Sequence, residues 1–260
     1  MRQALFTIAQ DETDLLPLWV SHHRRAYPGA AIYVLDHDSV GDAAVYLREA
    51  RKLGVVVVPV HHAESFDYNW LARTVEAFGA FLLRSHETVG FSEVDELLVP
   101  LAPFELSVSQ PFARATGYCV VHQHPAEPDL RWGESILAQR KYWYRSERYS
   151  KVAMFQQPVY YRDGFHRAYN VPDTLEPAPD LLCVHLHLAD YQTTLRRHQR
   201  NAGRLWAPRA RLSPEGIHQR LDDPEKLQRY LLCDLDRPEQ YAQLEEIPAN
   251  IKERVCLRLE

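Results

Sequence analysis

The chain has 260 residues, of which 46% are hydrophobic and 25% are charged, and its formal net charge is −5 at pH 7. These ordinary globular values exclude a collagen-like or largely disordered chain and give no reason to expect a nucleic-acid partner. No run approaches the roughly 20 apolar residues of a transmembrane segment, and the acidic residues that follow position 10 do not fit a signal peptide. Because the four cysteines form no C-x-x-C pair, a disulfide framework and a zinc ribbon are both disfavoured, and we expect a cytoplasmic protein.

The first hundred residues alternate short apolar runs with stretches of helical periodicity. The apolar runs predict four strands, at Ala4–Ala9, Ala31–Leu35, Val55–Val60 and Thr88–Phe91. The periodic stretches predict three helices: one that begins at Leu15 and is stopped by Pro28-Gly29, one at Ala43–Lys52 and one at Trp70–Leu83. Strands that alternate with helices of this length are typical of β-α-β units. We therefore expect an α/β fold with a mixed, mainly parallel sheet flanked by helices.

The second half has a more mixed pattern. It predicts strands at Gly117–His122, Val152–Tyr161 and Leu181–Leu188, and a basic helix at Asp190–Asn201. Ser213-Pro214-Glu215 has the pattern of a helix start, and the last 45 residues are predicted to form a helical C-terminal extension. Residues 131–211 carry 14 basic and 7 acidic side chains, which suits a small anionic ligand such as a diphosphate, or else a solvated charged face.

An acidic cluster follows the fourth predicted strand, at Glu93-Val94-Asp95-Glu96. In an open parallel sheet the ligand lies beyond the carboxyl ends of the strands. If the strand continues, Glu93 and Asp95 point to the same side and offer two hard oxygen ligands to Mg²⁺ or Mn²⁺. The alternative is a solvated acidic turn.

A second acidic pair, Asp36 and Asp38, ends the second predicted strand. Strand alternation would place both on one side, where carboxylates accept hydrogen bonds from ribose hydroxyls or a base edge. The same residues also fit an ordinary strand-to-helix turn, with Ser39 or Asp42 as the cap.

His185 and His187 are predicted to share one face of the Leu181–Leu188 strand. Imidazole is a common ligand for transition metals, and a histidine that met Asp95 across a cleft would favour Mn²⁺ over Mg²⁺. We expect His187 as the metal ligand and His185 as its support or substitute. In the alternative interpretation, both rings pack in the core under the basic helix.

Several well-known catalytic motifs are missing from the sequence. It contains no G-x-S-x-G elbow, no G-x-G-x-x-G loop and no Walker A loop. A serine hydrolase, a classical dinucleotide site and an ATP P-loop are therefore disfavoured.

Four segments together resemble family 2 glycosyltransferases, which have the GT-A fold. Thr7–Glu12, followed by Leu16–Trp19, is similar to the first strand and helix of that group. Tyr33–Ser39 is similar to its second-strand motif, and Ser92–Pro100 resembles its "Asp-x-Asp-Glu-Phe" strand end. Lys151-Val152 and His185–His187 look like its later part, so the resemblance covers roughly residues 4–200.

The resemblance implies that a sugar is moved from a nucleotide-diphosphate donor to an acceptor hydroxyl with the help of Mn²⁺ or Mg²⁺. It implies a donor nucleoside held by Ala9, Asp36 and Asp38, and a cation on Asp95. Glu93 stands where the group usually has the first Asp of its metal motif, and we expect it at the donor. The basic residues expected to stabilise the leaving diphosphate are Arg73, Lys151, Arg196 and Arg197.

An inverting transfer also needs a carboxylate that deprotonates the acceptor hydroxyl. Glu134 is the first candidate for this base and Asp129 is the second. The acceptor, which could be a glycan, a lipid-linked sugar or a small molecule, is not specified by any motif.

The resemblance divides the chain into a GT-A-like catalytic domain at residues 1–205 and a helical extension at residues 206–260. Within the domain, residues 1–100 form the nucleotide-binding half and residues 101–205 the acceptor half. Two alternatives remain: a nucleotidyltransferase that makes a nucleotide sugar, and a catalytically silent sugar-binding or scaffold protein of the same fold.

Overall fold

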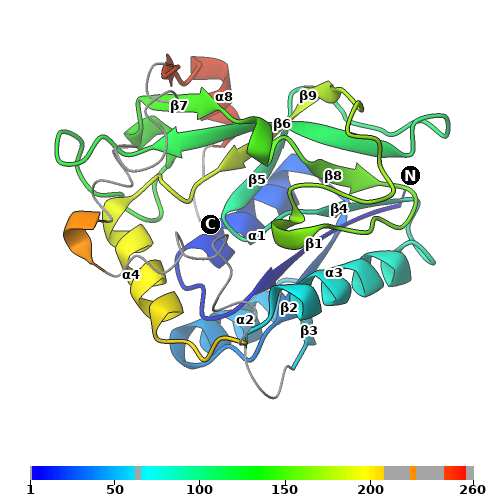
Figure 1. Ribbon diagram of the computed structural model, residues 1–260, viewed down its shortest axis with the longest axis horizontal. Helices are drawn as coiled ribbons and strands as arrows, with labels where there is room; N and C mark the ends of the chain where they lie inside the picture. Colours follow the sequence, from blue (N-terminus) through cyan, green and yellow to red (C-terminus); the bar gives the residue numbers. More distant parts are fainter. Residues whose placement is uncertain (1, 62–65, 208–222, 227–242, 256–260) are drawn as a thin grey trace. The chain divides into compact units, whose positions relative to one another are not determined.

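A computed structural model describes residues 2–61, 66–207, 223–226 and 243–255 of the chain (Figure 1). These form two compact units, which are described separately below. The first unit comprises residues 1–61, 68–117 and 146–184, and the second comprises residues 62–67, 118–145 and 185–260. The predicted helix start at Ser213–Glu215 lies outside the described residues, so the helical extension stays a prediction.

The first unit is built on a mixed sheet with the strand order β6-β8-β4-β1-β2-β3. The bounds of these strands are β1 Gln3–Ala9, β2 Ala31–Asp36, β3 Val56–Pro59, β4 Thr88–Phe91, β6 Phe112–Val121 and β8 Val152–Phe155. β1 pairs in parallel with β2 and β4, and β2 pairs in parallel with β3, whereas β8 runs antiparallel to β4 and β6. The predicted mixed, mainly parallel sheet is confirmed.

Three helices connect the parallel strands, as the sequence periodicity predicts: α1 Leu15–Ala26, α2 Gly41–Lys52 and α3 Tyr68–Leu82. The chain runs from β1 to β2 and β3 on one side, and then returns to place β4 on the other side of β1. The strand order therefore switches at β1. α3 packs its Phe78 edge-to-face against Phe6 of β1, with the ring centroids 5.3 Å apart.

β5 (Glu96–Pro100) pairs with β9 (Pro177–His185) and is held by two adjacent histidines of α1. His22 donates from Nε2 to the Leu98 carbonyl at 2.9 Å, and His23 accepts the Leu98 N–H on its Nε2 at 3.2 Å. His23 also donates from Nδ1 to the Trp19 carbonyl at 2.8 Å. Both rings are fully buried. They satisfy the buried N–H and carbonyl groups of Leu98, which in a sheet would bond to a neighbouring strand.

Two predicted strands of the second half end earlier than expected. β8 stops at Phe155 and does not reach Tyr161, because Pro158 has no N–H to offer a ladder. β9 stops at His185, so His187 lies beyond the strand and not within it.

The second unit contains the end of β6 with β7 (Tyr142–Arg145) and β10 (Glu245–Glu246), which are paired antiparallel. Its helices are α4 (Tyr191–Ala202), which confirms the predicted basic helix, and the short α8 (Ala249–Arg254). Asp190 caps α4 by accepting the Thr193 N–H on its side chain at 2.9 Å. Among the described residues, no helix is long and apolar enough to cross a bilayer.

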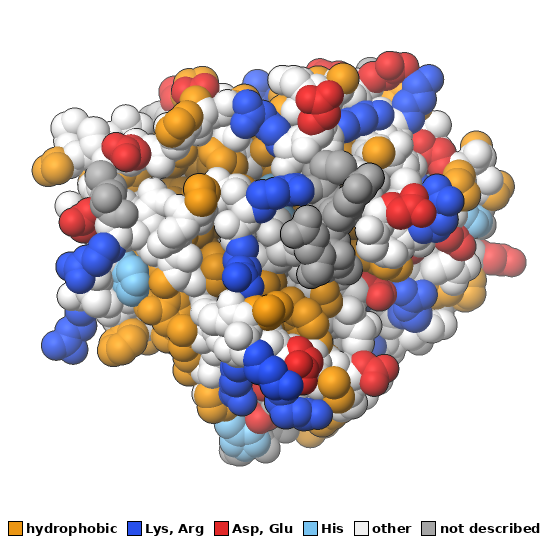
Figure 2. Space-filling view, turned by 180° about the vertical axis from the view of Figure 1, so that it is seen from behind, with side chains coloured by type: hydrophobic (Ala, Val, Ile, Leu, Met, Phe, Trp, Pro, Cys, Tyr) orange, Lys and Arg blue, Asp and Glu red, His pale blue; other side chains and the backbone are white. Residues whose placement is uncertain are grey.

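Charges of both signs are interspersed among the described side chains on the face seen in Figure 2.

Candidate functional site

The loops that follow β1 and β2 are tied together at the carboxyl edge of the sheet. Asp11 accepts the Val40 N–H on Oδ1 at 2.8 Å, and its own N–H donates to Ser39 Oγ at 3.1 Å. Asp36 accepts the Ser39 N–H at 3.0 Å. This network fixes the strand end that carries the predicted nucleoside ligands, next to Ala9 on β1.

Asp38 does not continue the strand, so the alternation that was expected to pair it with Asp36 does not apply. Its backbone has φ +56°, in the left-handed region, and Asp11 has φ +55°. A non-glycine residue there costs on the order of 1–2 kcal/mol and is often found at a ligand-binding site. The Asp38 carboxylate instead meets His61 Nδ1 at 2.5 Å, with both side chains partly exposed.

The acidic segment after β4 is a turn and not an extended strand, because Glu96 N donates back to the Glu93 carbonyl at 2.9 Å. The prediction that strand alternation places Glu93 and Asp95 on the same side is therefore wrong, because the two residues do not lie in a strand. The segment still lies at the carboxyl end of β4, beside β1. Asp95 is 7% exposed, and the Glu93 side chain keeps 32% of its surface exposed.

Behind this turn lies a buried ion pair. Lys151 Nζ is 2.7 Å from Glu96 Oε2 and 2.9 Å from Glu93 Oε2, and the Lys151 side chain is 1% exposed. Burial lowers the pKa of the lysine, but the two carboxylates raise it well above its ordinary value, so the lysine stays charged. Of the other predicted diphosphate contacts, Arg73 on α3 is paired with Glu76 on the same helix.

The predicted histidine pair lies in the second unit. The rings of His185 and His187 stack with centroids 5.7 Å apart and an interplanar angle of 13°, so the two do share a side. His187 contacts His198, Nε2 to Nε2 at 3.2 Å, and Arg197 at 3.5 Å from its Nδ1. His185 contacts the buried Cys119 thiol at 3.6 Å. Their role as metal ligands stays a prediction.

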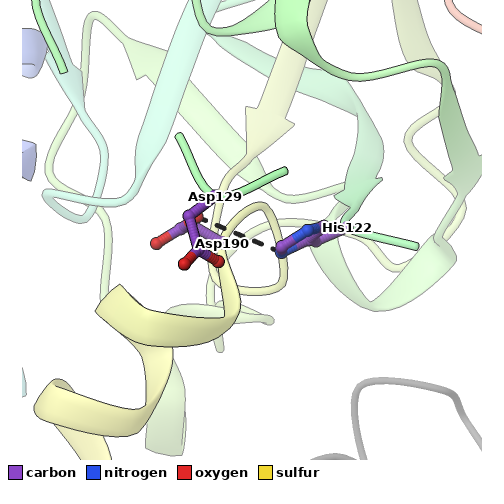
Figure 3. Close-up of side chains that lie close together, drawn as sticks. All are labelled: His122, Asp129 and Asp190. Atoms are coloured by element: carbon purple, nitrogen blue, oxygen red, sulfur yellow. Dashed lines mark ion pairs between the residues drawn. The ribbon is translucent and has the colours of Figure 1, made fainter. Parts of the chain in front are cut away.

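The second unit also brings His122, Asp129 and Asp190 together, with ligand atoms within 4.8 Å of one another (Figure 3). His122 and Asp190 are buried, and Asp129 is exposed. A metal would need a free nitrogen on His122, but Nδ1 accepts the Tyr191 N–H at 3.0 Å and Nε2 donates to the Glu127 carbonyl at 2.9 Å. Burial lowers the pKa of His122, which fits this neutral tautomer.

The carboxylate oxygens of Asp190 also accept hydrogen bonds from the protein. Besides capping α4, its Oδ1 accepts from Leu130 N at 2.8 Å and from Arg140 Nη2 at 3.2 Å. Arg140 is itself buried and already supplies the positive charge at this carboxylate. The cluster therefore fits a structural network that holds α4, and it does not fit a cation.

The two predicted base candidates have different surroundings. Asp129 lies at the edge of the network just described. Glu134 follows Gly133, which has φ +94°, and pairs with Arg131 at 2.9 Å with an exposed side chain. Both assignments stay predictions.

Three features of the site were not foreseen from the sequence. His61 pairs with Asp38, Glu96 and Lys151 form the buried ion pair, and Ser39 links the loops. Adjacency of the first two βα loops could have suggested the Ser39 link. The other two pairs join residues 23 and 55 positions apart, and no local pattern indicates them.

No family model and no curated protein matches the sequence. The solved structures similar to it include the glycosyltransferase GlyE from Streptococcus pneumoniae TIGR4, at 15% identity over 44% of this chain and 30% of that one, with a TM-score of 0.32. Glucosyl-3-phosphoglycerate synthase from Mycobacterium tuberculosis, in complex with Mn²⁺, UDP and glucosyl-3-phosphoglycerate, has 16% identity over 45% and 44%, with a TM-score of 0.32. The mannosyltransferase PcManGT from Pyrobaculum calidifontis, in complex with GDP-Man and Mn²⁺, has 12% identity over 88% and 69%, with a TM-score of 0.38.

These similar structures are glycosyltransferases of the GT-A type, the group that the sequence motifs resemble. The chain spans less than half the length of the first two of them.

Proposed function

We propose that this chain is a nucleotide-sugar-dependent glycosyltransferase, which moves a sugar from a nucleotide-diphosphate donor to an acceptor hydroxyl with the help of Mn²⁺ or Mg²⁺. The observation that carries the proposal is the pair of acidic strand ends on either side of β1. Asp36 ends β2, and the Glu93–Asp95 turn follows β4. Ligands of open parallel sheets bind beyond the carboxyl ends of the strands, where the strand order switches.

The acidity of this edge favours a cation-bridged donor over a directly bound phosphate. A diphosphate is an anion, so neighbouring carboxylates repel it unless a cation lies between them. The loop from Gln10 to Asp14 has no glycine and holds three carboxylates, which makes the start of α1 a poor phosphate site.

Carboxylate oxygens are the ligands that Mg²⁺ and Mn²⁺ prefer, and Asp95 with Glu93 supplies them at this edge. When bound there, the cation would stabilise the charge that develops on the leaving diphosphate. Asp36 and Asp38 are proposed to accept hydrogen bonds from the nucleoside. Asp129 or Glu134 is proposed as the base, and Arg197 as a further contact to the diphosphate.

The proposal is tested first by thermal-shift titration of the whole chain with UDP, GDP and TDP, each with and without Mn²⁺. We expect one nucleotide to raise the melting temperature in a Mn²⁺-dependent manner. Release of nucleoside diphosphate from the matching sugar donor then identifies the transferase, whereas release of pyrophosphate from a nucleoside triphosphate would identify a nucleotidyltransferase. A chain that responds to none of these ligands would be a scaffold.

Replacing Asp36 by Ala should mainly raise the KM for the donor. A hydrogen bond to a charged group contributes about 1.5–3 kcal/mol, so we expect KM to rise roughly 10- to 100-fold with kcat little changed. Steady-state kinetics against donor concentration measures both. Asp42→Ala is the matched control, because this exposed carboxylate lies six positions further on and its loss should leave KM unaltered. A large fall in kcat at unchanged KM would contradict the assigned role.

A further inference from the structure

The acidic turn is closed by the side chain of the residue that ends it. Glu93 N donates to Glu96 Oε2 at 2.9 Å, while Glu96 N donates to the Glu93 carbonyl at 2.9 Å. Ser92 Oγ donates to the Glu96 carbonyl at 3.1 Å and accepts from Trp19 Nε1 at 2.8 Å. The conformation of the turn therefore depends on where the Glu96 carboxylate is held.

Lys151 holds that carboxylate from the buried side. Its ammonium group contacts the same Oε2 that accepts the Glu93 N–H, and it also contacts the Glu93 carboxylate. One cation thus fixes both the side chain and, through Glu96, the backbone of Glu93. The face of the Phe165 ring lies 6.0 Å from the ammonium group.

The backbone of Lys151 is anchored as well. Its carbonyl accepts the Ala115 N–H at 2.9 Å, and Ser150 Oγ accepts the Gly117 N–H at 3.0 Å. Only glycine fits at position 117, because an added Cβ would lie 2.4 Å from the Tyr149 carbonyl carbon. The lysine therefore reaches the turn from a rigid support.

Three carboxylates in four residues repel one another, and burying Glu96 among them is unfavourable unless a cation compensates its charge. At 1% exposure, the lysine has no surface left for a ligand. Lys151 can therefore only neutralise and orient the carboxylates from the protein interior.

We infer that Lys151 is a positioning residue: it holds the Glu93–Asp95 turn in the geometry that binds the cation and the donor diphosphate, without touching either. This inference rests on the proposed function and refines it, because Lys151 is then a support for the acidic turn and not a contact of the donor.

The test separates positioning from stability with two variants and a control. Lys151→Met removes the charge, and Lys151→Met/Glu96→Gln removes both charges with nearly matched volumes. Lys141→Met is the control, because Lys141 forms an exposed ion pair with Glu246. For each protein, thermal unfolding gives the melting temperature, and calorimetric titration with UDP, GDP and TDP in Mn²⁺ gives the affinity at a temperature where the protein is folded.

We expect Lys151→Met to lose both stability and affinity. The double variant should regain most of the melting temperature, since the fully buried Glu96 carboxylate is replaced by a neutral amide, but its Mn²⁺-dependent nucleotide affinity should stay at least 10-fold below the wild type. If Lys151→Met does not fold, the double variant carries the comparison. Lys141→Met should bind as the wild type does.

Wild-type affinity in either variant would overturn the positioning role and leave the proposed function standing. A wild type that binds no nucleotide in Mn²⁺ would overturn the proposed function and this role with it.

Discussion

Replacing Asp95 by Asn should lower sugar transfer by about 100-fold or more while the chain stays folded. The substitution keeps the volume of the side chain but removes the charge that is proposed to hold the cation. A catalytic cation contributes several kcal/mol of transition-state stabilisation, and each 1.36 kcal/mol is a tenfold change in rate. The rate of nucleoside diphosphate release at saturating Mn²⁺ measures the effect, and circular dichroism checks the fold.

Asp180→Asn serves as the matched control, since it is the same exchange at an exposed position of β9 in the same unit. It should leave the rate within about twofold of the wild type. The rate of Glu93→Gln should lie between those of Asp95→Asn and Asp180→Asn, because the charge of Glu93 is already partly neutralised by its ion pair with Lys151. Full activity of Asp95→Asn, or undiminished wild-type activity in EDTA, would rule out the metal role.

The elements around this site are largely predictable from the sequence, because each one leaves a local periodic pattern. β1, β2, β3 and β4 fall within one or two residues of their predicted bounds. Parallel β-α-β connections then place their carboxyl ends along one edge, so the general position of Asp36 and Asp95 follows from the strand ends alone.

The local geometry of the site is not predictable in the same way. Asp38 turns into the left-handed region, and Glu93–Asp95 folds back as a turn, so period-two alternation fails at both strand ends. The contacts that stabilise these conformations come from His61 and Lys151, which the chain brings in from distant positions. Hydrophobic periodicity predicts which face of an element is buried, but it does not predict which polar residue from a distant part of the chain will contact that element.

We expect the two adjacent histidines of α1 to make the protein less stable at acid pH. His22 and His23 are fully buried, and each uses an imidazole nitrogen on the backbone of Leu98. Burial lowers the pKa of His22 to about 4 and lowers that of His23 well below its ordinary value. The acceptor role of His23 requires a neutral ring, so protonation of His23 breaks the hydrogen bond that it accepts from Leu98 N–H.

The direction of the effect follows from the two states. Below about pH 6.5 the unfolded chain binds protons on both histidines, whereas in the folded chain His22 stays neutral until the pH approaches 4 and the pKa of His23 is also lowered by burial. The contribution of these histidines to the free energy of unfolding should therefore be fully present above pH 7 and decrease as the pH drops. His22 alone contributes a loss of about 2 kcal/mol by pH 5. Urea unfolding followed by tryptophan fluorescence from pH 8 to pH 4.5 measures it.

Replacing His22 by Gln should flatten this pH dependence. The glutamine amide does not titrate, so between pH 5 and 6 the slope should decrease by about one proton, or roughly 1.4 kcal/mol per pH unit. At pH 8 the variant should be less stable than the wild type, since a shorter amide fits the Leu98 carbonyl less well. Arg24→Gln, on the exposed side of the same helix, should keep the wild-type slope. If His22→Gln retains the full slope as well, the acid sensitivity arises elsewhere, and the two rings serve only as packing for β5.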